Sequence, residues 1–229
     1  MQQLTLPISW AFSYKSSDFI VSDCNRYAFE WLERWPFHIK DNFVCLVGDV
    51  RSGKTLLSKI WASRLGAEFI HAKEDIFNKW YAISSETSDY KYFVIDDADE
   101  INDNILLYYI YNTLKEKNAH ALFTAKIPPA KWVVTLDDIK SRISTVHVIR
   151  IQPPNEFVTK MMIKKLLLQR GIQVSDEVVN YIANTIERSY DSINYWVTQI
   201  DKKINKNMKA TLFNIKKIIK HTYMESNQI

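Results

Sequence analysis

The residues GDVRSGKT at positions 48–55 are the strongest indication of the fold in this chain of 229 residues. It matches the pattern GxxxxGK[ST] and holds two of the four glycines in the whole sequence. The run at residues 43–47 before it is apolar and partly β-branched, as in a buried strand. Over residues 56–65 the apolar side chains recur at helical spacing on one face. We therefore expect a strand, a glycine loop and a helix, in that order.

This local structure is one that binds phosphate, because the loop N–H groups and the helix N-terminus point at an anion. In such a loop Lys54 would reach the β- and γ-phosphates of a nucleotide, and Thr55 would ligate Mg²⁺. A plain glycine turn between two elements is the structural alternative. The pattern thus predicts a site for a nucleotide and Mg²⁺.

A second part of this site is predicted at two strand ends. The apolar run at residues 92–95 ends in Asp96 and Asp97, and another at residues 121–123 ends in Thr124. In a parallel sheet these ends face the nucleotide crevice. Asp96 would hold Mg²⁺, Asp97 would orient or deprotonate the attacking water, and Thr124 would position water or the γ-phosphate. Taken alone, the two acids could equally form a capped turn, and the threonine could simply end a strand.

Further strands are expected at residues 68–71 and 146–151, with helices at 75–82 and 102–117 between strands. Strands that alternate with helices indicate an α/β fold with a parallel, five-stranded sheet. After Pro153-Pro154 the pattern is helical only, with helices at 157–170, after Ser175, at about 191–205 and after Thr211. The expected organisation is an N-terminal peptide at 1–12, an α/β nucleotide-binding domain at 13–152 and a small all-α lid at 153–229.

The composition narrows the class of protein further. The formal net charge of +4 permits nucleic-acid contact without requiring it. Neither the two cysteines, Cys24 and Cys45, nor the five histidines show metal-ligand spacing, so we expect no metal beyond Mg²⁺. The sequence has no secretory signal and no apolar run of about 18 residues, which favours a soluble protein of the cytoplasm without a membrane partner.

These motifs together resemble the AAA+ ATPases of the DnaA initiator clade. Residues 18–26 resemble the segment that flanks the adenine, residues 95–99 the Walker B strand, and residues 138–143 the box with the arginine finger. The resemblance implies that Arg142 reaches into a neighbouring subunit's ATP and that Thr124 is the sensor-1 residue. It also implies that ATP or ADP is bound with Mg²⁺. The nucleotide contacts implied by the motifs are Ile20, Val21, Asn25, Gly48, Arg51, Ser52, Gly53, Lys54, Thr55, Leu56 and, in the lid, Arg188.

Within that clade the chain is most similar to the regulatory factors of the Hda type, which open with a sliding-clamp-binding motif of the QLxLPL kind. The matching residues here are Gln3, Leu4, Leu6, Pro7 and Ile8. The resemblance implies two partners, the DNA polymerase sliding clamp and the DnaA initiator, whose ATP hydrolysis the factor triggers. It implies localisation at the nucleoid through the replisome, leaves a homodimer open, and provides no sequence-specific DNA reader.

One position departs from the family pattern. Asp191 falls where the family's sensor-2 arginine lies, and Arg188 lies one turn earlier. A carboxylate there would repel phosphate. Either Arg188 substitutes, or the lid does not sense the γ-phosphate, so we expect the chain's own ATP hydrolysis to be weak or absent.

Other functions stay open at the level of the sequence. An initiator or a helicase loader shares the same core, although the chain is short for a helix-turn-helix reader after the lid. A small-molecule P-loop kinase and a scaffold without ATPase activity are two further alternatives. For residues 3–8 the alternatives are an edge strand, which Pro7 disfavours, and a targeting signal, for which the basic region is missing.

Overall fold

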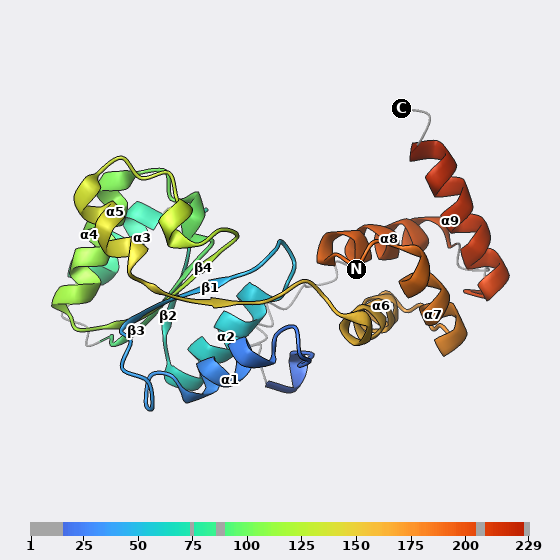
Figure 1. Ribbon diagram of the computed structural model, residues 1–229, viewed down its shortest axis with the longest axis horizontal. Helices are drawn as coiled ribbons and strands as arrows, with labels where there is room; N and C mark the ends of the chain where they lie inside the picture. The colour runs from blue at the N-terminus through green and yellow to red at the C-terminus, as the bar shows by residue number, and fades with distance from the viewer. Residues whose placement is uncertain (1–15, 74–75, 86–89, 205–208, 227–229) are drawn as a thin grey trace, which may run out of the picture.

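The structure is a computed structural model that describes residues 16–73, 76–85, 90–204 and 209–226. Its first part is an α/β unit, and from residue 156 onward every element is a helix (Figure 1). The strands are β1 Phe43–Val47, β2 Glu68–His71, β3 Tyr92–Asp96, β4 His120–Ala125 and β5 His147–Arg150. The helices of the α/β unit are α1 Arg26–Arg34, α2 Lys54–Leu65, α3 Ile76–Ser85, α4 Asn104–Glu116 and α5 Asp137–Ser144. The later helices are α6 Glu156–Gln169, α7 Asp176–Thr185, α8 Tyr190–Lys203 and α9 Leu212–Ser226.

The five strands form one parallel sheet in the order β2-β3-β4-β1-β5, which confirms the predicted fold class. The C-terminal ends of neighbouring strands are aligned: Val47 on β1 pairs with Ala125 on β4, and His71 on β2 pairs with Asp96 on β3. The loops that follow β1, β3 and β4 therefore leave the sheet at one edge. That edge is where the residues of the predicted site were expected to meet.

The strands are buried on both faces, as their continuous apolar runs predict. On β1, Cys45 and Val47 pack with α3, α4 and α5, whereas Val44 and Leu46 pack with α1 and α2. The alternation follows from the two-residue period of a strand. Helices thus cover both faces of the sheet (Figure 1).

The helices α6 to α9 have an apolar core of their own, built around residues such as Ile163, Ile182 and Ile215. Their N-termini begin near the expected residues. The Ser175 and Ser189 hydroxyls accept hydrogen bonds from the first turns of α7 and α8, and the Thr211 hydroxyl accepts one from the Asn214 N–H. Most helix bounds differ from the predicted ones by one or two residues.

Two helices of the α/β unit were not predicted. Helix α1 begins at Arg26, the last residue of the segment taken to flank the adenine, and its Asn25 N-cap makes no side-chain capping bond to the helix. Helix α5 has only eight residues, too few for a periodic pattern to stand out. Within the described residues, no helix is long and apolar enough to cross a membrane.

Candidate nucleotide and metal site

The glycine loop between β1 and α2 is tightly curled. Gly53 has φ +96°, and a Cβ there would lie 2.9 Å from the Phe19 ring. A Cβ at Gly48 would lie 2.7 Å from the Ser52 Oγ. Arg51 also has a left-handed backbone, with φ +65°. Left-handed residues within such a turn direct successive N–H groups into a concave anion site.

Lys54 is held inside this loop. Its side chain is buried, and its ammonium donates to the Gly48 carbonyl at 2.8 Å and to the Asp49 carbonyl at 2.9 Å. Burial lowers the pKa of Lys54, and the nearby carboxylates Asp97, Asp99 and Asp96 oppose that shift. The neighbouring carboxylates thus favour the charged ammonium, and the loop carbonyls position it.

Three predicted residues meet at the edge of the sheet. The Asp96 carboxylate is fully buried and accepts hydrogen bonds from the Thr124 hydroxyl at 2.6 Å and from the Thr55 hydroxyl at 3.0 Å. These oxygens come from β3, β4 and the first turn of α2. Hard oxygen ligands of this type suit Mg²⁺. The residues present therefore fit a magnesium ion held by Asp96 and Thr55.

Asp97 follows directly and has a left-handed backbone with φ +56°. Its N–H donates to the Thr124 hydroxyl at 2.9 Å, so Thr124 bridges the two acids. The Asp97 side chain is about one-fifth exposed and lines the cleft beside the loop. It is thus the more accessible of the two carboxylates, as a group that orients water must be.

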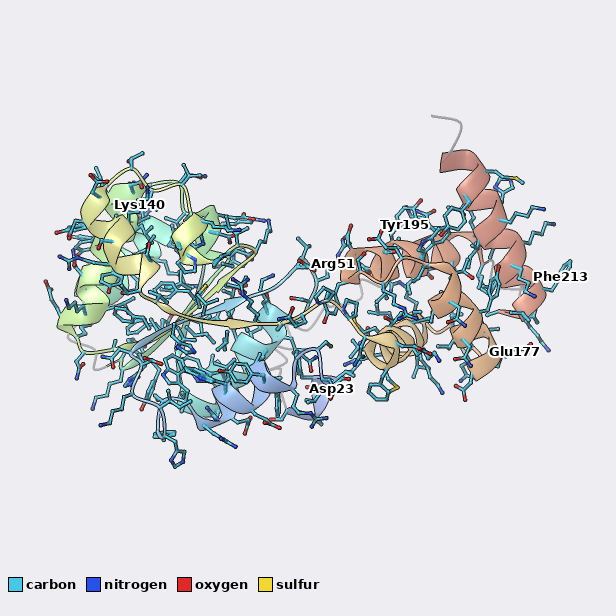
Figure 2. All side chains as sticks on the ribbon, viewed as in Figure 1. Asp23, Arg51, Lys140, Glu177, Tyr195 and Phe213 are labelled. Carbon is cyan, nitrogen blue, oxygen red and sulfur yellow. The ribbon has the colours of Figure 1, made fainter. Side chains whose placement is uncertain are left out.

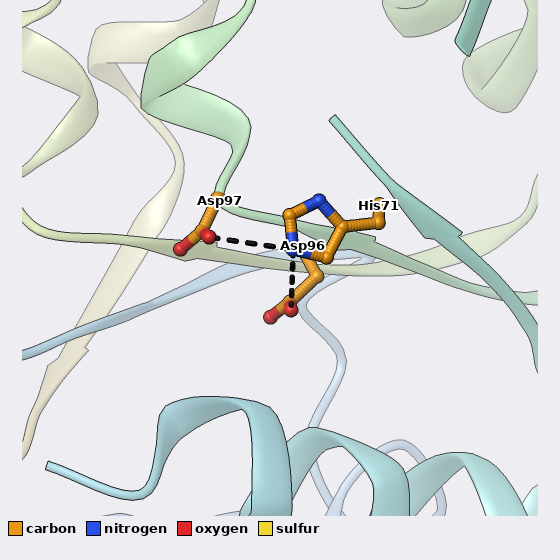
Figure 3. Close-up of side chains that lie close together, drawn as sticks. All are labelled: His71, Asp96 and Asp97. Atoms are coloured by element: carbon orange, nitrogen blue, oxygen red, sulfur yellow. Dashed lines mark ion pairs between the residues drawn. The ribbon is translucent and has the colours of Figure 1, made fainter. Parts of the chain in front are cut away.

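His71 is a neighbour that the sequence did not predict. Its Nε2 lies 3.5 Å from an Asp97 oxygen and 3.8 Å from an Asp96 oxygen (Figure 3). The Lys73 N–H donates to the His71 Nδ1 at 3.1 Å. In the neutral ring Nδ1 then carries the lone pair and Nε2 the proton. His71 therefore presents an N–H to the two acids and is not assigned as a metal ligand.

A cleft of about 370 Å³ lies beside the loop and is lined by Lys54, Thr55 and Asp97 together with Lys73 and Lys126. Glu100 holds both added lysines, at 3.0 Å from the Lys73 ammonium and 2.7 Å from that of Lys126. The hydrogen bonds from Lys126 and then Lys73 lower the pKa of Glu100. Lys73 and Lys126, which lie outside the GxxxxGK[ST] motif, thus add two positive charges beside the place where phosphates would bind.

A second cleft, of about 260 Å³, adjoins the other side of the loop. It lies between the loop and residues 18–25 on one side and α6 and Tyr190 on the other. Six predicted nucleotide contacts line it: Ile20, Asn25, Arg51, Ser52, Gly53 and Leu56. The Ser52 Oγ is buried there and has no hydrogen-bond partner within the described residues. A polar ligand would supply one.

The segment before α1 is shaped by Asn25. Its side-chain amide donates to the Ile20 carbonyl at 2.8 Å, and its oxygen accepts from the Ser22 N–H at 2.8 Å. Asn25 is therefore occupied in holding the loop. Val21, which was also expected to contact the nucleotide, is not among the residues that line the cleft and packs instead against the core beneath α1 and α2.

The lid reaches the loop through a residue pair that the sequence did not predict. Arg51 forms an ion pair with Asp191, in the first turn of α8, and Asn194 can accept from the same guanidinium at 2.8 Å when its amide is turned. Arg188 lies away from both clefts, with its guanidinium 3.8 Å from the Glu156 carboxylate. This placement differs from the expected nucleotide contact, because the first turn of α8 brings the acid, and not Arg188, to the loop.

Arg142 also lies outside both clefts. It sits on α5, about one-third exposed, and donates to Asp138 at 2.9 Å and to Asn112 at 3.1 Å. The expected clamp-binding residues 3–8 lie outside the residues that the structure describes.

We predict that Thr124→Val destabilises the protein by about 1–3 kcal/mol, because it leaves the buried Asp96 with one donor fewer and the Asp97 N–H without its partner. Urea unfolding followed by circular dichroism measures this. The control is Thr113→Val, whose hydroxyl only bonds back to the Tyr109 carbonyl on α4. Equal stability changes in the two variants would contradict the proposed bridge.

The relatives that match this chain by sequence include chromosomal replication initiators. No family model matches the chain. The chromosomal replication initiator DnaA of Wolinella succinogenes is 26% identical over 94% of this chain and 54% of its own length. DnaA of Symbiobacterium thermophilum is 33% identical over 41% of this chain and 20% of its own. The chain spans about half the length of these relatives or less.

Solved structures show the same fold. Domain III of Thermotoga maritima DnaA superposes with a TM-score of 0.70 at 17% identity, over 91% of this chain and 96% of that one. AMPPCP-bound DnaA of Aquifex aeolicus gives 0.67 at 19%, over 95% and 72%. The Holliday-junction branch-migration motor RuvB of Thermotoga maritima gives 0.66 at 16%, over 90% and 71%. By sequence the chain is similar to DnaA initiators, and its fold is that of the P-loop domains of DnaA and RuvB.

Proposed function

We propose that this protein binds ATP or ADP with Mg²⁺ in the two clefts on either side of the glycine loop. The observation that carries the proposal is the meeting of Lys54, Thr55, Asp96 and Thr124 at one edge of the sheet. Two of the solved structures with this fold are DnaA bound to the nucleotide analogue AMPPCP, which supports the same ligand class here.

Each residue has a defined part in this proposal. The phosphates lie in the curled loop, where Lys54 turns its ammonium from the loop carbonyls to them. Thr55 and Asp96 hold Mg²⁺, which neutralises phosphate charge. The cleft next to Ile20, Leu56 and Met162 receives the base, because its walls are partly apolar.

We further propose that the protein regulates replication initiation in the manner of Hda-type factors. Residues 3–8 would bind the sliding clamp, and Arg142 would act on the ATP of a DnaA initiator. The position of Arg142 outside its own clefts, with its side chain about one-third exposed, supports action on another subunit. The Asp191–Arg51 pair supports weak hydrolysis of its own nucleotide, because an acid stands at the loop where the family has an arginine. In this proposal the chain divides at residue 153 into an α/β core and a helical lid.

An initiator-like or helicase-loader-like role is the second candidate. It is favoured by one observation, that the curated relatives described above are DnaA initiators. The two candidates differ in their partners. The regulator requires the clamp and the initiator, whereas a loader requires the replicative helicase.

We predict that Lys54→Ala weakens MgADP binding by about 10- to 100-fold, the value of a charge-assisted hydrogen bond to phosphate. Isothermal titration calorimetry measures it. The control is Lys91→Ala, which removes an exposed lysine just before β3. Unchanged affinity in the Lys54 variant, with the fold intact by circular dichroism, would refute the phosphate site.

The regulatory role predicts that Arg142→Ala abolishes stimulation of ATP hydrolysis by the ATP-loaded initiator in the presence of DNA-loaded clamp. An arginine finger contributes about 10³- to 10⁵-fold, so the loss is measurable as phosphate release. The matched control is Arg26→Ala, on the exposed side of α1. Undiminished stimulation by the Arg142 variant would show that the finger is misassigned.

The same assay separates the two candidate functions. The double variant Leu4→Ala/Leu6→Ala should lose clamp pull-down and stimulation while its MgADP affinity is unchanged. If it still binds the clamp, the peptide assignment is wrong. If the wild-type protein binds helicase in place of clamp and initiator, the loader is the correct function.

A further inference from the structure

The charge of the chain is concentrated near its C-terminal end. Residues 202–224 hold seven of the 30 Lys and Arg residues and none of the 26 Asp and Glu residues. The remainder of the chain therefore has 23 basic against 26 acidic residues and is slightly negative. An asymmetry of this kind is typical of a segment that binds a polyanion.

Helix α9 places part of this charge on one face. Ile215, Ile218, Ile219 and Thr222 are buried, which assigns one side of the helix to the lid core. At 100° per residue, residues 213, 216, 217 and 220 then fall together on the opposite side. We call Phe213, Lys216, Lys217 and Lys220 the α9 basic face. Figure 1 shows α9 at the end of the lid farthest from the sheet.

The charges of the three lysines on this face are not neutralised by acidic side chains within the described residues. Lys216, Lys217 and Lys220 are exposed, and within the described part of the chain none of them forms an ion pair. The Lys216 ammonium lies 5.3 Å from the centre of the Tyr181 ring, which leaves its charge in place. The three ammonium groups are therefore accessible to an anionic partner.

Phe213 distinguishes this face from an ordinary solvated one. Its side chain is 76% exposed and projects from the start of α9 away from the neighbouring helices (Figure 2). It lies four residues before Lys217 and seven before Lys220, so the ring and both ammonium groups share one side of the helix. An exposed aromatic ring beside a row of cations is the combination that binds single strands, because every unpaired base offers a face for stacking.

We propose that the α9 basic face binds single-stranded nucleic acid without sequence preference. The lysines contact backbone phosphates, and Phe213 stacks on an unpaired base. A duplex would satisfy the lysines but not the ring, since its bases are already stacked. The proposal is independent of the nucleotide site, because α9 contributes no residue to either cleft.

The test is fluorescence anisotropy of a labelled 20-nucleotide oligo-dT, titrated with the full chain at several salt concentrations. We expect Lys216→Gln/Lys217→Gln/Lys220→Gln to weaken binding by about 100-fold at 0.1 M salt. Each lost phosphate contact removes about 0.7 from the slope of log K against log salt, so the slope should fall by about 2. Phe213→Ala should weaken binding by at least about fivefold and leave the slope unchanged.

The matched control is Lys40→Gln/Lys91→Gln/Lys115→Gln, which removes the same charge from exposed positions of the α/β unit. It should bind within about twofold of the wild type. Equal losses in the two triple variants would overturn the proposal, since the attraction would then depend on net charge alone. A duplex of equal length bound as tightly as the single strand, with no effect of Phe213→Ala, would also overturn it.

Discussion

The buried carboxylate of Asp96 is the constraint on which the rest of the site depends. A carboxylate taken out of water is costly unless it is hydrogen-bonded, by several kcal/mol for an ion without partners. Its two donors come from other elements, Thr124 on β4 and Thr55 at the start of α2. The helix can therefore satisfy Asp96 only when its first turn lies over the ends of β3 and β4. In that position the glycine loop before α2 must curl, and Lys54 is drawn in against the loop carbonyls.

The lid is connected to this arrangement by a contact of a different kind. Arg51 and Asp191 are each about half exposed or more, so their ion pair adds little stability. The ion pair matters because it joins the lid to Arg51, a residue of the loop that would hold the phosphates. The phosphates of a bound nucleotide would compete with Asp191 for the Arg51 guanidinium. We therefore expect nucleotide binding to change the contact between the lid and the loop. Tyr190, next to Asp191, lines the cleft and donates to the Gln152 carbonyl at 3.0 Å, which links the lid to the chain leaving β5.

The sequence predicted the parts of this structure that depend on local pattern. Strands such as Phe43–Val47 are continuous apolar runs between polar turns, and GxxxxGK[ST] has one backbone arrangement that its glycines allow. The sequence did not predict the residues that other strands and loops bring to the site when the sheet assembles. His71 meets Asp96 because β2 pairs with β3, and Lys73 and Lys126 meet at Glu100 from different loops. The place of Arg188 beside Glu156 depends on structure of a related kind, because the turn before α8 decides which side chain faces the loop.

Hydrogen exchange of the backbone amides shows whether the curled loop binds a nucleotide. The rates are compared with and without MgADP, residue by residue. We expect slower exchange at residues 49–55, whose N–H groups would hold the phosphates, and at residues 20–25 beside the second cleft. Unchanged rates at residues 49–55 under saturating MgADP, or protection confined to other parts of the chain, would contradict it.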